Sequence, residues 1–363
     1  MNILYISHLS KNIAAGPVWS VPACVYAQSK IDNVFWINFT DVLKPHWQNV
    51  SAFHHYREFG SFNLSKLPAS FNSPDLVVFE DFYYFDDVKL SWQLRKKKIP
   101  YIIVPRGALT KEALHNHARL KKYIANILFF DSFVNHSLAV QFLTQGECDN
   151  SISRYSTNYL IVPNGFDIPF EYKRKFSKDK IKAVFIGRID IYHKGLDLLC
   201  DAIHNQKEKL QKAGFTLDIY GPQRCDYYKL SSYIVKHNIS DIIRVKGEVS
   251  GDEKRNVLLE SDLFIMTSRL EGHPMGLIEA LAYGVPAFVT RGTNMKDQIE
   301  ETNAGWTCEG SVEDIEESLL LMIKERTDLP MKGEAARQLS YNYDWNKLAF
   351  TFHEKINNLL SNL

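Results

Sequence analysis

Short apolar runs alternate with helix-like segments along nearly the whole chain, and this alternation constrains the fold more than any other feature. In the first half, helical segments are expected near 18–30, 87–98 and 113–128, and the apolar runs lie at 2–7, 33–39, 75–79, 100–104, 139–143 and 159–162. Strands that are apolar along their whole length are buried on both faces, as in a parallel sheet covered by helices on each side. The first half therefore predicts an α/β domain with a parallel sheet.

Turn-forming residues and a basic stretch interrupt this pattern in the middle of the chain. The turn sequence 162–167 ends the first series, and the polar stretch 171–182 predicts a linker. The alternation then restarts, with strands expected at 183–187, 215–220, 242–246, 263–267 and 286–290. We therefore expect two doubly wound, Rossmann-like domains, 1–168 and 169–344, facing each other across a cleft. The last segment, 345–363, is expected to be a helix that packs back on the N-terminal domain.

Composition and charge narrow the class of protein. Of the 363 residues, 45% are hydrophobic and 23% are charged, which is typical of a globular chain long enough for two cores. A net charge of +1 gives no field that would attract nucleic acid, so no such partner is expected. There is no secretion signal, no apolar stretch long enough to span a bilayer, and no Cys-x-x-Cys pair among the five scattered cysteines. We therefore expect a cytoplasmic protein, at most peripheral on the inner face of the membrane.

The segment 268–286 carries the most specific local signal. After an expected strand, a loop containing Pro274 and Gly276 leads into a short helix. Free backbone amides at such a helix start, here those of Met275, Gly276 and Leu277, point out of the helix end and favour a bound diphosphate.

Two carboxylates flank this loop. Glu271 and Glu279 are separated by seven residues. Because a carboxylate beside a phosphate would be repelled, each is expected to face sugar hydroxyls, which a carboxylate accepts in a bidentate way. A plainer interpretation is an ordinary helix start with a solvated Glu271 and a surface Glu279.

A second strand end supplies cations. Gly187 and Arg188 close the first expected strand of the second domain, and Lys194 and Gly195 precede the next helix. Because ligands bind at the carboxyl ends of parallel strands, Arg188 and Lys194 can converge on one phosphate and stabilise a leaving diphosphate without a metal. The plainer interpretation is an ordinary turn with two solvated bases.

Together these segments resemble the Glu-x7-Glu and Gly-Arg…Lys-Gly motifs of GT-B retaining glycosyltransferases of family 4, or group 1, of the bacterial surface-polysaccharide type. The resemblance extends over nearly the whole chain and implies a nucleoside diphosphate sugar donor, uridine diphosphate by family frequency, with no metal and no other cofactor. Glu271 would approach the donor sugar and Glu279 the ribose, and Glu271, Arg188 and Lys194 would form the catalytic set. The implied donor-binding residues are Gly16, Gly187, Arg188, Lys194, Gly247, Val249, Glu271, His273, Pro274, Met275, Gly276, Leu277 and Glu279.

In this family the first domain carries the acceptor side. Gly16 lies in the first strand-to-helix loop, where the family often has a glycine pair. Arg106 follows an expected strand in a Pro-Arg-Gly segment that has a histidine in many members, and it would supply a fixed cation. Further acceptor candidates are Tyr83 in an aromatic loop and His115 and His117 on an expected helix. For these three residues, simple packing or surface exposure is the plainer alternative.

Basic residues cluster in the segment 89–122. It holds ten lysines and arginines and a single acid, Glu112. Solvated helix faces would explain this composition. The more specific hypothesis is that the segment docks on an anionic membrane surface, where each base contributes about 1 kcal/mol.

The reaction implied by the resemblance is transfer of the sugar, with retention, to a hydroxyl of an acceptor glycan or lipid-linked glycan, in the synthesis of a cell-surface polysaccharide. Same-face attack assisted by the leaving diphosphate is the expected route. A sugar-nucleotide epimerase or hydrolase of the same fold and a non-catalytic nucleotide-sugar binding protein are the alternatives. A dinucleotide-dependent oxidoreductase would need Gly-x-Gly-x-x-Gly after the first strand, which residues 7–20 lack.

Overall fold

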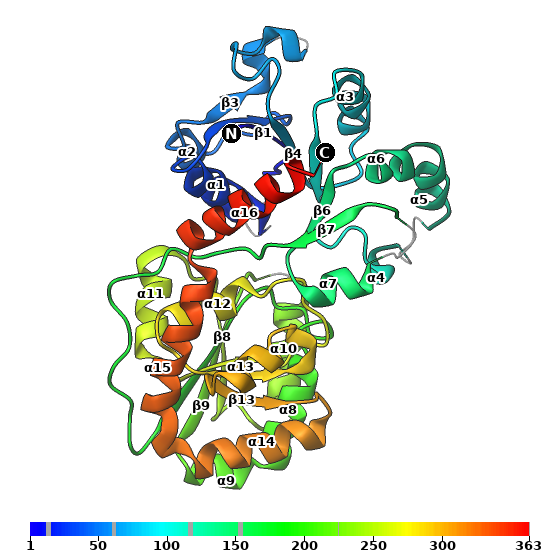
Figure 1. Ribbon diagram of the computed structural model, residues 1–363. Helices are drawn as coiled ribbons and strands as arrows, with labels where there is room; N and C mark the ends of the chain where they lie inside the picture. Colours follow the sequence, from blue (N-terminus) through cyan, green and yellow to red (C-terminus); the bar gives the residue numbers. More distant parts are fainter. Residues whose placement is uncertain (12–15, 60–62, 115–118, 152–154, 224, 363) are drawn as a thin grey trace. The chain divides into compact units, whose positions relative to one another are not determined.

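The computed structural model describes residues 1–11, 16–59, 63–114, 119–151, 155–223 and 225–362. The chain divides into two units (Figure 1). The N-terminal unit comprises Met1–Gly165 together with Trp345–Leu363, and the C-terminal unit comprises Phe166–Asp344.

A parallel sheet forms the centre of the N-terminal unit, with strand order β3-β2-β1-β4-β5-β6-β7. Ile3 of β1 pairs with Val34 of β2 on one side and with Leu76 of β4 on the other. Every residue of β4 and β5 is buried, as their unbroken apolar runs require. The strands are β1 Asn2–Ser7, β2 Asn33–Asn38, β3 Phe53–His55, β4 Leu76–Glu80, β5 Tyr101–Val104, β6 Ala139–Phe142 and β7 Asn158–Ile161.

Helices connect these strands and cover the sheet (Figure 1). The α-helices are α1 Pro17–Gln28, α2 Pro45–Gln48, α3 Phe85–Lys96, α4 Lys111–Leu114, α5 Arg119–Ala125, α6 Asp131–Asn135, α7 Gln145–Asn150 and α16 Trp345–Leu360. Two short 3-10 turns are η1 Tyr56–Phe59 and η2 Leu64–Lys66, and η3 Asn126–Phe130 is a π-helical turn between α5 and α6. Within the expected helix 113–128, the described residues belong to α4, α5 and η3.

The C-terminal helix α16 lies beside α1 in the N-terminal unit (Figure 1). Leu348, Phe352 and Ile356 of α16 share one buried core with Val21 and Val25 of α1. The apolar face of α16 thus completes the core on this side of the sheet.

A buried carboxylate fixes α16 to the start of the chain. The Asp32 side chain is fully buried and accepts hydrogen bonds from the Met1 ammonium at 2.7 Å, Gln28 Nε2 at 2.6 Å and His353 Nδ1 at 2.9 Å. Burial alone would raise the pKa of Asp32, but these hydrogen bonds outweigh it and lower the pKa below its ordinary value.

The C-terminal unit has a second parallel sheet, with strand order β10-β9-β8-β11-β12-β13. Its strands are β8 Ile181–Ile186, β9 Phe215–Tyr220, β10 Ile243–Lys246, β11 Leu263–Met266, β12 Ala287–Thr290 and β13 Gly305–Cys308. Its α-helices are α8 Leu196–Asn205, α9 Lys207–Lys212, α10 Cys225–Lys236, α11 Gly251–Glu260, α12 Met275–Ala282, α13 Lys296–Glu301, α14 Val312–Lys324 and α15 Leu329–Ser340, with 3-10 turns η4 Arg291–Thr293, η5 Arg326–Asp328 and η6 Tyr341–Tyr343. Within the described ranges, no helix is both long and apolar enough to cross a membrane.

The stretch 171–182 is mostly exposed and has no helix or strand before β8, but one of its lysines is buried. Lys173 is buried, and its Nζ lies 3.1 Å from Oδ1 of Asp262 and 3.2 Å from the carbonyl oxygen of Leu259. The backbone of Lys173 also packs closely on Gly284, where a Cβ would lie 3.2 Å from the lysine carbonyl. A lysine in this stretch is therefore a buried counter-ion of the C-terminal unit, because a nearby aspartate compensates its charge.

Both sheets are parallel throughout, so the prediction of two doubly wound α/β domains is confirmed. In each sheet the chain order reverses beside a central strand, between β1 and β4 and between β8 and β11. At such a reversal the strand-to-helix loops diverge, which leaves room for a ligand at the carboxyl ends of the two strands.

Candidate functional site

In the C-terminal unit, the carboxyl ends of β8 and β11 bring two loops together. Gly187 and Arg188 follow β8, and Thr267 and Ser268 follow the neighbouring β11. Gly195 has φ +60°, and a Cβ at this position would lie 2.0 Å from the carbonyl oxygen of Thr267. Glycine is therefore required here, because only a residue without a side chain lets the loop after β8 reach the end of β11.

An ion pair joins these two loops. Lys194 Nζ contacts Glu271 Oε1, and the two side chains are only 14% and 11% exposed. The Ser268 hydroxyl donates to the same carboxylate oxygen at 2.6 Å. The Thr267 hydroxyl donates to the carbonyl of Lys194 at 3.2 Å, so the lysine is held through its backbone as well as its ammonium. The fold thus brings two of the residues predicted to be catalytic into direct contact.

The backbone of Glu271 is fixed from a third loop, which follows β12. Its amide donates to the carbonyl of Gly292 at 2.8 Å, and the Asn294 amide group donates to its carbonyl. A Cβ on Gly292 would lie 2.3 Å from the carbonyl oxygen of Ser268. Sequence analysis missed this support, since Gly292 and Asn294 lie outside the segment that carries the two glutamates.

Arg188 is the cation of this cluster that is most open to solvent. Its side chain is 66% exposed, and its nearest acidic partner is Asp190, at 3.5 Å from Nη2. Burial alone would raise the pKa of Asp190, but hydrogen bonds from the amide and the ring of His193, both at 3.0 Å, lower the pKa instead. Asp190 is therefore engaged mainly by His193, and the Arg188 guanidinium is left available to an anion.

The start of α12 packs on the end of β8. A Cβ on Gly276 would lie 2.7 Å from the carbonyl oxygen of Ile186, so glycine lets the helix start approach the strand end. The expectation of three free amides is wrong for at least two of them. The Met275 amide donates to the carbonyl of His273 at 3.0 Å, and the Leu277 amide donates to Pro274 at 3.0 Å. The reason is a tight turn at Pro274, which closes local hydrogen bonds before the helix begins.

Glu279 is also paired. Its Oε2 contacts Nζ of Lys254 on α11, and the two side chains are partly buried. Sequence analysis missed Lys254, because nothing in the local pattern of α11 indicates that it faces α12. A ligand hydroxyl that binds Glu279 must therefore share this carboxylate with Lys254 or displace it.

The loop after β10 approaches the same strand ends. The Gly221 amide donates to the carbonyl of Gly247 at 3.2 Å, and a Cβ on Gly221 would lie 2.4 Å from the carbonyl oxygen of Gly187. The Val249 side chain is buried in the core of the unit. Of the residues predicted to border the nucleobase, Val249 can therefore offer its backbone but not its side chain.

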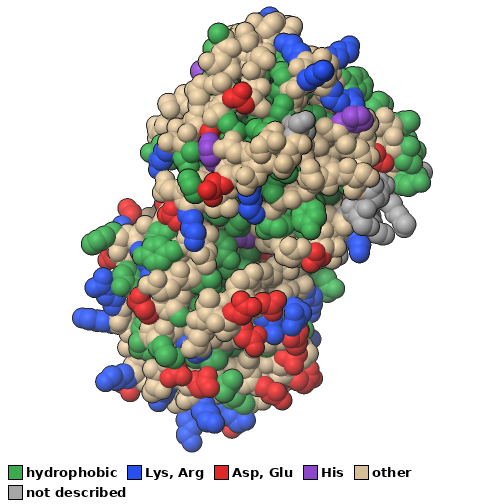
Figure 2. All heavy atoms as spheres, in the orientation of Figure 1, with side chains coloured by type: hydrophobic (Ala, Val, Ile, Leu, Met, Phe, Trp, Pro, Cys, Tyr) green, Lys and Arg blue, Asp and Glu red, His purple; other side chains and the backbone are tan. Residues whose placement is uncertain are grey.

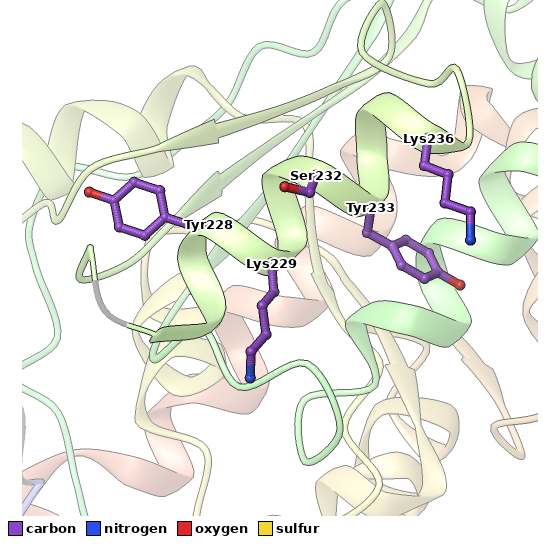
Figure 3. Close-up of a pocket in the computed structure, with 5 residues that line it drawn as sticks. All are labelled: Tyr228, Lys229, Ser232, Tyr233 and Lys236. Atoms are coloured by element: carbon purple, nitrogen blue, oxygen red, sulfur yellow. The ribbon is translucent and has the colours of Figure 1, made fainter.

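A shallow, open hollow of about 450 Å³ lies elsewhere, on α10 (Figure 3). Its lining comes from that one helix, and the side chains spread along it without converging on a common point: Tyr228, Lys229, Ser232, Tyr233 and Lys236. The Tyr233 hydroxyl already donates a hydrogen bond to Oδ1 of Asp201 at 2.5 Å. No predicted donor residue lines this hollow, so it is not the candidate site. Among the residues described, no group of three or more His, Cys, Asp or Glu side chains is arranged to hold a metal ion.

In the N-terminal unit, the Arg106 guanidinium is held inside the protein. Nε and Nη2 donate to Oε2 of Glu80 at 2.9 and 2.7 Å, and Nη1 donates to Ser20 at 3.1 Å and to Asn164 at 3.2 Å. The side chain is buried and borders a cavity of about 20 Å³, enough for one water molecule. Arg106 therefore joins β4, α1 and the turn after β7, and its guanidinium is not presented to solvent.

The structure describes one further acceptor candidate, Tyr83, and the predicted donor-binding residue of this unit, Gly16. Tyr83 has φ +68°, and its hydroxyl accepts a hydrogen bond from Asn126 at 3.3 Å. Gly16 precedes α1, and a Cβ there would meet no atom within 4 Å. His115 and His117 lie outside the described residues.

Sequence analysis missed three titratable groups near the reversal point of this first sheet. His8 follows β1, and its Nε2 lies 2.9 Å from Oδ1 of the buried Asp87, while its ring stacks on Tyr84 at 3.7 Å. Asp81 follows β4 with φ +105°, a backbone conformation that a side chain disfavours. Burial raises the pKa of both Asp81 and Asp87. The signal that could have found His8 and Asp81 is their position directly after a buried strand.

The C-terminal unit is similar to known glycosyltransferases. The family model described as "Glycosyl transferases group 1" matches residues 169–342. One of the subunits of human phosphatidylinositol N-acetylglucosaminyltransferase is 26% identical over 252 residues, which are 66% of this chain and 50% of that protein. The putative teichuronic acid biosynthesis glycosyltransferase TuaC of Bacillus subtilis is 36% identical over 112 residues, which are 31% of this chain and 25% of TuaC.

A solved structure extends the likeness to the whole fold. The crystal structure of HepE from Anabaena in complex with UDP is 15% identical, covers 99% of this chain and 100% of its own, and superposes with a TM-score of 0.74. At this identity the likeness concerns the fold alone. The chain spans about half the length of the human relative and a quarter of the Bacillus relative. Residues 169–342, which contain both the carboxylate and the cation loops, match the Glycosyl transferases group 1 family.

Proposed function

We propose that this chain is a glycosyltransferase that moves a sugar from a nucleoside diphosphate sugar to a hydroxyl of an acceptor glycan, with retention at the anomeric carbon. The observation that carries the proposal is the contact between Lys194 and Glu271 at the ends of β8 and β11, beside the open Arg188. A cluster of cations next to a carboxylate suits a ligand that has phosphate at one end and hydroxyls at the other.

Arg188 and Lys194 serve the diphosphate in this proposal, and the positive end of the α12 dipole supports them. As the bond to the sugar breaks, negative charge develops on the leaving phosphate, and both cations stabilise it more than they stabilise the bound donor. Lys194 can do so because it is held between the two loops with its ammonium already pointing at the site. No metal is needed for this charge, so the proposed reaction is metal-independent.

The two carboxylates serve the hydroxyl groups. Glu271, once it accepts a sugar hydroxyl, shares its charge between that hydroxyl, Lys194 and Ser268. Glu279 takes the ribose, and the hydroxyls then compete with the ammonium of Lys254 for its carboxylate. The incoming hydroxyl attacks from the face that the diphosphate leaves, and a phosphate oxygen accepts its proton, so that the configuration is retained.

The donor and the acceptor are proposed from chemistry and from relatives. A uridine diphosphate sugar is favoured because the HepE structure of the same fold holds UDP. The name of the Bacillus relative points to a cell-wall polysaccharide, and that of the human relative to a sugar on a phospholipid. We favour the glycan of a cell-surface polysaccharide, carried on a lipid, which combines both kinds of acceptor.

A lipid-linked acceptor places the N-terminal unit at a membrane. In this proposal, the basic segment 89–122 faces anionic lipid on the inner side of the membrane. Arg106 takes no part, because its charge is compensated by Glu80. Lys96, Lys97 and Lys98 at the end of α3 are exposed and can take this role.

The decisive test is release of nucleotide from a panel of nucleotide sugars, with and without candidate acceptor glycans. We expect acceptor-dependent release that is lost in Arg188→Ala and in Glu279→Gln, while Arg57→Ala, which changes an exposed arginine paired with Asp41, keeps wild-type turnover. Near-normal turnover in either site variant would overturn the site assignment. Release of free sugar without an acceptor would indicate an epimerase or hydrolase, and donor binding without turnover would indicate a binding protein.

A further inference from the structure

Large apolar side chains are exposed together on one part of the N-terminal unit. Tyr123 and Ile124 of α5 are 57% and 49% exposed, and Ile127 and Leu128 of η3 are 54% and 61% exposed. Phe85, at the start of α3, is 51% exposed, and its ring lies 5.4 Å from that of Phe129, the residue after Leu128. We call these five exposed side chains the apolar patch: Phe85, Tyr123, Ile124, Ile127 and Leu128. Contiguous exposed apolar side chains of this kind mark interaction sites.

The exposure follows from the helical geometry and not from a loosely packed segment. Residues four apart lie on one side of a helix, as Tyr123 and Ile127 do, and as Ile124 and Leu128 do. The opposite side of the same stretch is anchored, because Phe130 is buried in the core of the unit. A π-helical turn carries Ile127 and Leu128, and such turns are frequent at functional sites.

Basic residues accompany the apolar patch. α5 has the sequence RLKKYIA, with three bases and no acid, and η3 has no charged residue. Of these bases, Lys122 donates to the carbonyl of Ala113 at 2.7 Å and lies over the ring of Tyr83. At the far end of α3, Lys96 and Lys97 are exposed. Figure 2 shows hydrophobic side chains at the edge of the molecule over α5, and Lys and Arg side chains over α3. An apolar face with basic companions is the pattern of a helix that lies in the interface of an anionic bilayer.

We infer that α5 and η3 insert the apolar patch among the acyl chains of an anionic bilayer, while the exposed Lys96 and Lys97 contact lipid headgroups. This inference rests on the proposed function, in which the N-terminal unit lies at a membrane, and it names the element of that unit that binds the lipid. It differs from docking by charge alone in one respect. Salt screens the contact of lysines with headgroups, but it does not weaken the burial of apolar side chains.

The test is co-sedimentation of the full chain with vesicles of phosphatidylcholine, with and without phosphatidylglycerol, at about 0.15 M and about 1 M salt. The variant Ile127→Ser with Leu128→Ser removes apolar area at exposed positions, so the fold should be unaffected. The matched control is Leu321→Ser, which changes a leucine that is 45% exposed on α14 of the C-terminal unit. Acceptor-dependent release of nucleotide, with a water-soluble acceptor glycan, is measured in parallel, because it reports the donor site without requiring a membrane.

We expect binding to the anionic vesicles that partly persists at high salt. The double serine variant should bind on the order of tenfold more weakly at both salt concentrations, with unchanged acceptor-dependent release of nucleotide, and Leu321→Ser should bind like the wild type. Absence of vesicle binding, binding that is fully lost at high salt, or equal binding by the double variant would each overturn the inference. Self-association of the wild type that the double variant abolishes would also overturn it and assign the patch to a second copy. If vesicles bind but no acceptor-dependent release of nucleotide is found, the proposed function fails and the membrane inference stands.

Discussion

Replacing Gly195 with alanine tests whether the close approach of two loops positions Lys194. The added Cβ would lie 2.0 Å from the carbonyl oxygen of Thr267, whereas real Cβ atoms stay at least 3.0 Å from their neighbours, so one backbone must move by about 1 Å. Alanine at φ +60° adds about 1 kcal/mol of backbone strain, and the overlap adds about 1–3 kcal/mol. We therefore expect the free energy of unfolding of the C-terminal unit to fall by about 2–4 kcal/mol.

The same displacement acts on catalysis, because Lys194 is the adjacent residue. A shift of about 1 Å in a charged group costs roughly 100-fold in rate, so kcat/KM for nucleotide release should fall by that factor in the fraction that remains folded. Two controls separate the causes. Gly251→Ala has a similar φ of +54° but no atom within 4 Å, and Gly272→Ala, in the loop of Glu271, has neither the left-handed backbone nor a close neighbour. If Gly195→Ala loses no more activity than Gly251→Ala, the positioning argument is refuted.

Three further predictions concern charge. Lys254→Met should lower the donor KM up to about fivefold with kcat unchanged, because Lys254 competes with the donor for Glu279 and a partly exposed ion pair contributes about 0–1 kcal/mol. An unchanged or higher KM in steady-state kinetics would contradict this competition. Asp32→Asn should destabilise the N-terminal unit by about 3 kcal/mol near pH 7, because it leaves the ammonium of Met1 and the ring of His353 without a buried counter-charge. The folded-state pKa of Asp32 is lowered, so the wild-type advantage is present above about pH 4 and should shrink below it in urea titrations. A chelator should leave transfer unchanged, and a loss of turnover that Mg²⁺ or Mn²⁺ restores would refute the metal-independent route.

The sequence was sufficient to predict the two parallel sheets, because their central strands are unbroken apolar runs. Both edge strands that it missed, β3 and β13, are short, and neither is such a run: β3 is Phe-His-His, and β13 contains Gly305 and Thr307. β3 is only partly buried, whereas β13 is mostly buried, so the feature that hid both strands is a short sequence that is not continuously apolar.

The sequence predicted only those site residues whose side-chain chemistry stands within a recognisable loop motif. Lys194 and Glu271 stand in recognisable loops, and the fold brings them into contact. Ion-pair partners from distant segments limit how freely a ligand can bind these charges. Lys254 on α11 pairs with Glu279, and Glu80 on β4 pairs with Arg106. Such pairs depend on which faces of two elements meet, and periodicity within one element does not encode that.

The return of α16 to the N-terminal unit has a consequence for the order in which the chain can fold. The C-terminal unit is continuous, from Phe166 to Asp344, and its two ends meet, since the Phe166 amide donates to the carbonyl of Tyr343 at 2.8 Å. It can therefore complete its core as soon as it leaves the ribosome. The N-terminal unit is synthesised first, but the side of α1 that packs on α16 stays exposed to solvent until α16 has been synthesised. A chain that ends just before α16 would thus have a folded C-terminal unit and an N-terminal unit with an incomplete core. Chaperones and proteases in the cell would recognise that N-terminal unit as unfolded.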